Sequence, residues 1–307
     1  MQNAPDARPP DPRQHAVCCP VCGSNRSRVK FNPWRSVTDP IALYGAASGV
    51  PGTQRLVACT DCGMIYESPR FSDQVILEGY RSVRDGHDSQ YSSRVLGFKR
   101  ALASLRRVLP APPARVLDVG TAGGAFLEAA EQAGYFAQGL DPSPSLVESA
   151  RARGLRVELG SVDSHSFREK SFDLICLWDV IEHLPNPGHA LRALLPLLRP
   201  EGRLLINFPD AGTWAARLAG RRYWWILSVH LHHFTRDTLG NLCSRSGFEV
   251  IHFQRFWTGL ELGYLEEVAI QLGVPGASWL KRATPAFMKK WTVRYTASQT
   301  TAVARIQ

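Results

Sequence analysis

Four cysteines near the amino terminus fall into two pairs of identical spacing. Cys19 and Cys22 enclose two residues, Cys59 and Cys62 do the same, and a glycine follows each pair. Two such pairs supply the four thiolates of a tetrahedral zinc site. The interval between the pairs is longer than the usual ~15–20 residues, but its Gly/Pro-rich part, residues 45–52, can form a loop. The spacing therefore favours structural zinc over a redox pair or plain buried thiols.

The other three of the seven cysteines lack this spacing. Cys18 stands beside the first pair and is expected to be a bystander. Cys176 and Cys243 lie within predicted regular elements and are expected in the core. An odd number of cysteines with four in tight pairs suits reduced thiols better than a disulfide framework.

Three histidines are candidates for acid–base chemistry. His183 follows a predicted strand, and His230 and His232 follow the aromatic stretch 221–225. Imidazole titrates near neutrality, so each of the three could act as a general base. If the HLHH segment is extended, His230 and His232 project to one side. The alternatives are that His183 braces its loop and that the other two are polar residues of a lid or of the surface.

A glycine-rich turn links a predicted strand to a predicted helix in VLDVGTAGGAF, residues 116–126. Such a turn brings backbone close to a nucleotide at a helix N-terminus. The next predicted strand ends at Asp141, whose carboxylate can accept both hydroxyls of a ribose. The turn alone could be a tight structural connection, whereas an acid placed about 20 residues further on favours nucleoside binding.

Short apolar runs alternate with amphipathic segments from residue 115 onward, which is the pattern of βαβ units around a mainly parallel sheet. The expected strands cover residues 115–119, 136–140, 156–159, 172–177, 203–208, 248–253 and 300–306. The expected helices cover residues 125–133, 145–153, 189–198 and 236–246. The pattern predicts a doubly wound α/β fold, which binds its ligands at the carboxyl edge of the sheet.

These motifs together resemble the class I S-adenosylmethionine-dependent methyltransferases. The resemblance covers about residues 115–253 and rests on the glycine turn, on FDLICLWDVIEHLPNP, on LLRPEGRLLINFPD and on HLHHFTRDTLGNLCSRSGFEV. It implies a seven-stranded sheet with a reversed final strand, for which residues 300–306 are suited. N-terminal zinc ribbons with a trailing C-x-x-C-G-h-h-Y-x-x-P motif, here CGMIYESP, occur in a subset of the same family.

The family's D-x-G-x-G-x-G pattern falls on Asp118, Gly120, Ala122 and Gly124. Alanine thus replaces the middle glycine, and its methyl group could weaken cofactor binding. The resemblance implies that Asp118 and Gly120 line the methionine end of S-adenosylmethionine and that Asp141 binds its ribose.

The resemblance places the adenine of the cofactor at Ser161, Val162 and Asp163. The family's usual acid directly after the glycine is Ser161 here, so either Ser161 or Asp163 could meet the exocyclic amine. Trp178 and Asp179, at the end of the fourth strand, are further cofactor-binding candidates.

A metal ion is an alternative catalytic device. Asp179, Glu182 and His183 resemble the D/E-x-x-E-H arrangement with which some quinone-precursor O-methyltransferases hold a divalent ion. Such an ion could lower the pKa of an acceptor hydroxyl.

Composition excludes several other classes of protein. With 307 residues, 44% of them hydrophobic and 21% charged, the chain suits a globular fold and not a membrane bundle. Residues 1–16 lack the apolar run of a signal peptide and are expected to be a disordered tail. We expect a cytoplasmic protein with a zinc ribbon at 17–70, a helical connector at 71–113, and a methyltransferase domain at 114–307 with an inserted cap at 257–299.

The net charge of +9 suits an anionic partner without identifying one. The leading hypothesis is O-methylation of a small-molecule, saccharide or lipid-linked acceptor. The alternatives are an RNA methyltransferase that holds nucleic acid with its ribbon and a non-catalytic scaffold. Nucleic acid is disfavoured because the arginines form no stripe and no N-P-P-Y-type motif is present. The basic, aromatic segment 257–296 could cap the acceptor site, contact an anionic membrane or be a solvated helix face.

Overall fold

The structure of the protein is a computed structural model that describes residues 11–36, 39–45, 49–84, 90–271, 274–296 and 298–307. Residues 1–10 of the expected tail lie outside the described residues. The described end of that tail contains His15, whose backbone exchanges two hydrogen bonds with that of Arg70, at 2.9 and 3.0 Å.

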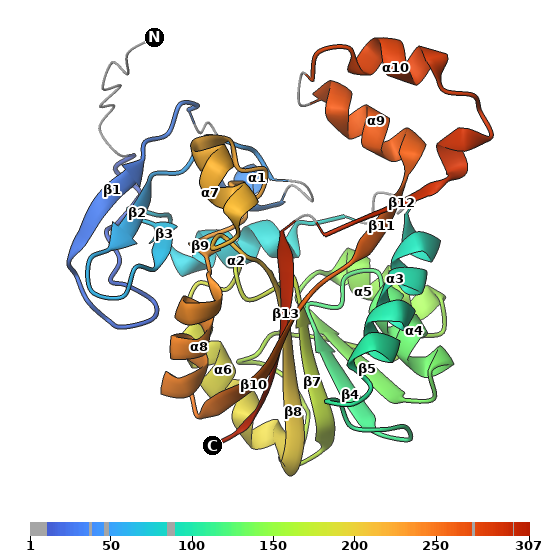
Figure 1. Ribbon diagram of the computed structural model, residues 1–307. Coiled ribbons are helices and arrows are strands. Elements are labelled where there is room, and N and C mark those ends of the chain that lie inside the picture. The colour runs from blue at the N-terminus through green and yellow to red at the C-terminus, as the bar shows by residue number, and fades with distance from the viewer. Residues whose placement is uncertain (1–10, 37–38, 46–48, 85–89, 272–273, 297) are drawn as a thin grey trace.

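A seven-stranded sheet forms the centre of the molecule (Figure 1). Its strands lie in the order β10 (Phe248–Arg255), β13 (Gln299–Ile306), β8 (Leu198–Pro209), β7 (Phe172–Trp178), β4 (Arg115–Val119), β5 (Phe136–Asp141), β6 (Val157–Leu159). The strand β13 is antiparallel to its two neighbours, β10 and β8, and the other neighbouring pairs of the sheet are parallel. The expected Rossmann-like, mainly parallel sheet with a reversed final strand is confirmed.

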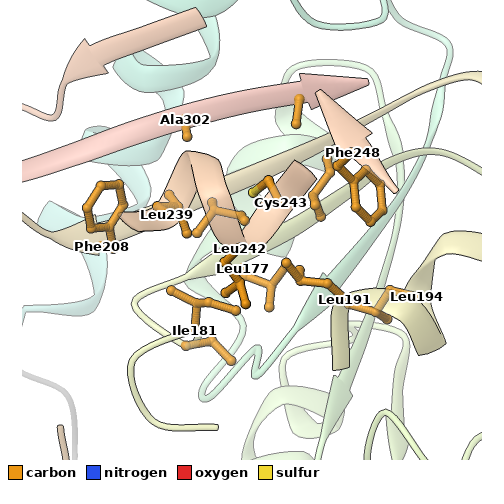
Figure 2. Packing of buried hydrophobic residues seen from close by; sticks show 14 of the residues in the cluster. Leu177, Ile181, Leu191, Leu194, Phe208, Leu239, Leu242, Cys243, Phe248 and Ala302 are labelled. Carbon is orange, nitrogen blue, oxygen red and sulfur yellow. The ribbon is translucent and has the colours of Figure 1, made fainter. Parts of the chain in front are cut away.

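Helices cover both faces of this sheet. On one face lie α3 (Tyr91–Leu105), α4 (Ala125–Gln132) and α5 (Pro144–Ala152), and on the other α6 (Pro187–Leu194) and α8 (Arg236–Arg245). Adjacent residues of a strand point to opposite faces, so Val116 packs with the first group of helices and Leu117 with the second. Figure 2 shows the second group, where Leu191 of α6 and Leu239 of α8 pack near Leu177 of β7.

One expected helix has different bounds. Residues 189–198 were expected to be helical, but α6 begins at Pro187 because the side chain of Asn186 caps it by accepting the N–H of His189. The helix ends at Leu194 and is followed by a 3-10 turn, η1 (Leu195–Leu197). Pro196 explains this end, because proline has no N–H with which to continue the helix.

A second, smaller sheet lies in the region of the cysteine pairs, and Cys59 ends one of its strands. Its strands are β1 (Ser27–Phe31), β2 (Leu56–Cys59), β3 (Ile65–Glu67) and β9 (His232–His233), all antiparallel. The strand β9 comes from the HLHH segment beyond β8, which was not among the expected strands. Met64 and Tyr66 of this region belong to the same buried cluster as the core shown in Figure 2. The cysteine-bearing sheet is therefore packed onto the larger one.

Two further helices lie in the amino-terminal part of the chain. The helices α1 (Pro40–Gly45) and α2 (Asp73–Arg81) pack together through a cluster that includes Tyr44, Phe71 and Ile76.

Two projections stand at the carboxyl edge of the parallel strands. One is α7 (Trp214–Ala219) with the 3-10 turn η2 (Gly220–Arg222), which follow β8. The other follows β10 and is carried by the antiparallel pair β11 (Thr258–Glu261) and β12 (Thr292–Tyr295). It contains α9 (Leu262–Gln271), α10 (Ala277–Ala283) and the 3-10 turn η3 (Met288–Lys290), and it extends away from the sheet in Figure 1. Among the described helices, none is both long enough and apolar enough to cross a bilayer.

Candidate functional site

The glycine turn between β4 and α4 has the backbone conformation that its residue types favour. Gly120 and Gly124 have φ angles of +70° and +87°. A side chain at Gly120 would clash with Val180, because its Cβ would lie only 2.6 Å from Cγ2 of Val180. The loop that follows β7 and contains Val180 therefore lies directly against this turn. Ala122 also has a positive φ, +49°, which costs an L residue about 1 kcal/mol. The position suits the glycine that the family pattern has there.

Asp141 at the end of β5 is hydrogen-bonded to the glycine turn. Its Oδ2 accepts the N–H of Ala122 at 2.8 Å, and its Oδ1 accepts the N–H of Ser143 at 2.9 Å. The side chain is buried, which raises its pKa above the usual carboxyl range. The carboxylate is thus held at the carboxyl edge of the sheet beside the turn.

Asp118 is a second buried carboxyl group, only 2% exposed. Burial raises its pKa to about 8, and the nearby charge of Asp141 acts in the same direction. Its Oδ1 and the hydroxyl of Thr121 are both buried without a hydrogen-bond partner. Buried polar atoms are rarely left unpaired. These two atoms therefore fit a polar or cationic group of a ligand, such as the ammonium of S-adenosylmethionine.

The expected adenine residues form a turn after β6. The N–H of Ser161 donates to the carbonyl of Ser164, and the reverse bond is also made, each at 3.0 Å. Val162 packs against the core, whereas Asp163 is exposed and its Oδ1 lies 2.6 Å from His189 Nε2. Asp163 thus already has a side-chain partner, while the hydroxyl of Ser161 accepts the backbone N–H of Asp163 at 3.3 Å.

Trp178 lies in an aromatic cluster on the face covered by α3 and α4. Its ring centroid is 5.0 Å from that of Phe98, 5.4 Å from Phe126 and 5.5 Å from Phe256. Its indole N–H is buried without a partner.

Asp179 follows Trp178 with a positive φ of +54°. Its Oδ1 accepts hydrogen bonds from the side-chain amides of Asn207 and Gln299, both at 2.8 Å. Burial raises the pKa of this carboxyl to about 6. Asp179 therefore joins the ends of β7, β8 and β13.

The loop after β7 brings Glu182 and His183 together with His230. One candidate ligand atom from each of the three side chains lies within 4.8 Å of the others. The Nδ1 atoms of His183 and His230 lie 2.8 Å from the carbonyls of Val229 and Trp225. A carbonyl only accepts, so each Nδ1 carries the hydrogen and each Nε2 keeps its lone pair.

Burial controls the charges in this cluster. It lowers the pKa of His183 to about 4 and that of His230 well below the usual value. It also raises the pKa of Glu182 well above the carboxyl range, and both carboxyl oxygens lack a hydrogen-bond partner. Two proton-free imidazole nitrogens beside a carboxyl group can accept a proton or bind a divalent ion.

The structure separates the histidines that were expected to share one side. His230 contacts His183, with ring centroids 4.8 Å apart. His232 lies in β9, and its Nε2 donates to the carbonyl of Leu184 at 2.9 Å. The potential ion-binding set also differs from the expected one, because His230 stands where Asp179 was expected and Asp179 is engaged by two amides.

Tyr80 of α2 is a neighbour of this cluster that sequence reasoning missed. Its hydroxyl donates to the carbonyl of Val229 at 2.9 Å and lies 3.0 Å from Nδ1 of His183. The two rings meet edge to face, with centroids 5.7 Å apart. The helical spacing predicts only that Tyr80 belongs to a helix, since no local pattern connects it with a residue so far along the chain.

The four paired cysteines converge. The Sγ atoms of Cys19 and Cys62 are 3.4 Å apart, those of Cys22 and Cys59 are 3.6 Å apart, and all four lie within 4.8 Å of one another. Tetrahedral zinc with bonds of about 2.3 Å requires sulfur atoms about 3.8 Å apart, so the four thiols fit the ion. All seven cysteines lie in the described part of the chain and none forms a disulfide, and Cys18 is exposed outside the cluster.

The sheet order and the glycine turn define a class I S-adenosylmethionine-dependent methyltransferase domain. A family model described as "Methyltransferase domain" matches residues 94–253, just over half of the chain, and the chain belongs to this family.

Similar curated proteins support this assignment over part of the chain. The ubiquinone biosynthesis O-methyltransferase of Xylella fastidiosa is 32% identical over 130 residues, which are 40% of this chain and 52% of the relative. The enzyme of the same name from Xanthomonas oryzae pv. oryzae is 35% identical over 101 residues, 31% of this chain and 42% of the relative. The chain thus matches about half the length of these curated relatives.

A solved structure supports the fold alone. A chain from the complex that the Trm112 methyltransferase activator of Haloferax volcanii forms with a methyltransferase matches 73% of this chain and 99% of its own length. The TM-score is 0.51 and the sequence identity 20%.

Proposed function

We propose that this protein transfers a methyl group from S-adenosylmethionine to a hydroxyl oxygen of a small-molecule, saccharide or lipid-linked acceptor. The observation that carries the proposal is the place of the Glu182, His183 and His230 cluster. Its Glu182 and His183 follow β7 in the same loop as Val180, which lies against Gly120 of the glycine turn. Relatives named as O-methyltransferases are similar in sequence to part of this chain.

Bound S-adenosylmethionine supplies a methyl group activated by the positive charge on its sulfur. In this proposal Asp118 and Gly120 line its methionine end, Asp141 binds its ribose, and residues 161–163 line its adenine. In the same proposal Gly124 allows the tight turn, and Ala122 lines it with a methyl group that would weaken cofactor binding relative to glycine. In this proposal Trp178 and Asp179 lie beneath the cofactor. Trp178 belongs to the aromatic cluster, and Asp179 joins the ends of three strands.

The proposed general base is His183. Its Nε2 carries a lone pair because Nδ1 donates to Val229, and its lowered pKa keeps it unprotonated at neutral pH. On accepting the acceptor's proton it would become a cation beside the buried carboxyl group of Glu182, and its positive charge would favour ionisation of that group. His230 presents a second proton-free nitrogen to the same space.

A divalent ion held by Glu182, His183 and His230 is an alternative way to activate the hydroxyl, since it would lower the hydroxyl's pKa. We also propose zinc at Cys19, Cys22, Cys59 and Cys62 within a ribbon over residues 17–70. In the same proposal, residues 71–113 connect this ribbon to the methyltransferase domain at 114–307, and the cap at 257–299 contacts the acceptor or a membrane surface.

The acceptor class can be tested with labelled S-adenosylmethionine and extracts of the source cell, separated into metabolite, lipid, glycan and RNA pools. We expect label in the metabolite, lipid or glycan pool. This label should not be released by base, as expected for a methyl group on a hydroxyl oxygen. Label confined to RNA would overturn the proposed acceptor, and no transfer into any pool would favour a non-catalytic protein.

The role of His183 can be tested by His183→Gln, with His252→Gln on β10 as control. Loss of a general base reduces turnover by about 10²–10⁴-fold, while binding of S-adenosylmethionine, measured by calorimetry, should persist. Activity that requires added Mg²⁺ or Mn²⁺ in the unchanged protein would assign the cluster to an ion. Unchanged turnover in His183→Gln would remove this residue from the mechanism.

A further inference from the structure

A cavity of about 500 Å³ lies where the first cysteine pair meets the methyltransferase core. Residues 17–23 form one wall, and the loop residues Pro185 and Asn186 before α6 form part of another. Arginines from three elements complete it: Arg70 before α2, Arg192 of α6 and Arg245 of α8. None of these arginines belongs to the proposed methyl-transfer site.

The cavity has an excess of positive charge. Arg70 is 6% exposed and donates to the carbonyl of Pro185 at 3.0 Å and to Asp73 Oδ1 at 2.9 Å. Arg192 and Arg245 are exposed, and neither has a hydrogen bond or ion pair with any residue that the structure describes. Asp73 is the acid of the lining, and it is already paired with Arg70. Two guanidinium groups thus remain available to an anion.

Two buried side chains of the lining also have polar atoms without partners. The Nε of Arg70 is a donor, and the Nδ1 of His232 is the other atom. His232 is 2% exposed, and its Nε2 donates to Leu184, so Nδ1 carries the lone pair and accepts.

We propose that this cavity, the arginine cleft, binds the phosphate group of a small hydroxylated molecule. Guanidinium groups bind phosphate through paired N–H donors, which suits Arg192 and Arg245. A hydroxyl of the same molecule would satisfy the lone pair on His232. A small ligand fits better than a nucleic acid strand, because two of the unpaired polar groups are buried in a cavity. The site is separate from the proposed methyl transfer and does not depend on it.

The test is calorimetric titration of the full chain, without S-adenosylmethionine, with glucose 1-phosphate. The variants are Arg192→Glu and Arg245→Glu, and the control is Arg107→Glu, an exposed arginine after α3. We expect glucose 1-phosphate to bind and glucose not to bind. Each cleft variant should weaken binding about tenfold or more, the control should leave it within about twofold, and added salt should weaken it in the unchanged protein.

Three outcomes would overturn the proposal. One is the absence of binding by glucose 1-phosphate, and another is equal binding by the unchanged protein and both cleft variants. The third is binding of a single-stranded RNA that both variants abolish while glucose 1-phosphate does not bind, which would assign the cleft to nucleic acid. Methyl transfer is measured separately, so a chain that binds glucose 1-phosphate and transfers no methyl group contradicts only the proposed function.

Discussion

Asp118 is a carboxyl group in a position where its ionised form is costly. Its pKa is about 8 in the folded chain and about 3.9 in an unfolded one. Between these values the folded state binds more protons than the unfolded state, so stability falls as the pH rises. The buried histidines have lowered pKa values, about 4 for His183 and about 3 for His232. Above pH 7 they are neutral in both states and contribute almost nothing.

Asp118→Asn should therefore reduce the loss of stability between pH 7 and pH 9 in the cofactor-free protein. Asparagine has a similar shape and does not titrate, so the variant should lose about 1 kcal/mol less than the unchanged protein over this range. Urea unfolding at the two pH values measures the difference. Equal losses in both proteins would mean that Asp118 is already ionised at pH 7.

At the scale of elements, local patterns predicted what local chemistry determines. The strand at 115–119 has the expected bounds, and the helix expected at 236–246 begins at Arg236, where the side chain of Thr235 caps α8. Both depend on residues that are neighbours in the chain. The pairing of β9 with β3 was not predictable in this way, because two histidines carry no strand pattern and their partner lies more than a hundred residues earlier.

The candidate site divides along the same line. The turn at Gly120 and Gly124 could be predicted because positive φ angles favour glycine. The association of His183 with His230 and Tyr80 could not be, since it depends on how three separate segments pack. Long-range packing also explains why Asp179 accepts hydrogen bonds from side-chain amides of β8 and β13. His230, and not Asp179, therefore completes the candidate ion-binding set.

The cysteine cluster leads to a prediction about metal content. Cys62→Ser removes one of four converging thiols, so it should lose zinc, whereas Cys18→Ser alters an exposed thiol outside the cluster and should keep it. Mass spectrometry of the metal in purified protein should find one zinc per unchanged chain. The Cys62→Ser variant should also melt at a lower temperature, because structural zinc contributes to folding. Unchanged protein that is folded and free of metal would reject the zinc site.

At the scale of the whole molecule, large apolar side chains are exposed on both projections at the carboxyl edge. Trp214 and Leu218 of α7 are 74% and 80% exposed, and Trp279 of α10 is 72% exposed. Basic residues accompany them, including Arg217 and Lys281. Aromatic and basic residues on one surface suit contact with an anionic bilayer, which would bring a lipid-linked acceptor to this edge.

Trp279→Ala should therefore weaken binding to phosphatidylglycerol vesicles, by up to about tenfold if the indole enters the bilayer. Phe136→Ala is the control, since Phe136 is also exposed but begins β5 at the opposite edge. Cosedimentation at low and high salt measures both, with phosphatidylcholine vesicles as the neutral comparison. If the unchanged protein does not sediment with anionic vesicles, the exposed tryptophans have another purpose.

The strand β9 limits how this chain can be divided. It completes the cysteine-bearing sheet, yet it lies between β8 and α8 in the sequence. A graft of residues 17–70 onto another enzyme would leave β3 with a bare edge, which invites pairing with foreign chains. Removal of all residues before residue 71 would likewise leave β9 without β3, its partner strand. The cysteine-bearing segment therefore cannot be transferred to another protein by itself. It would have to be transplanted together with the later part of the chain that supplies its fourth strand.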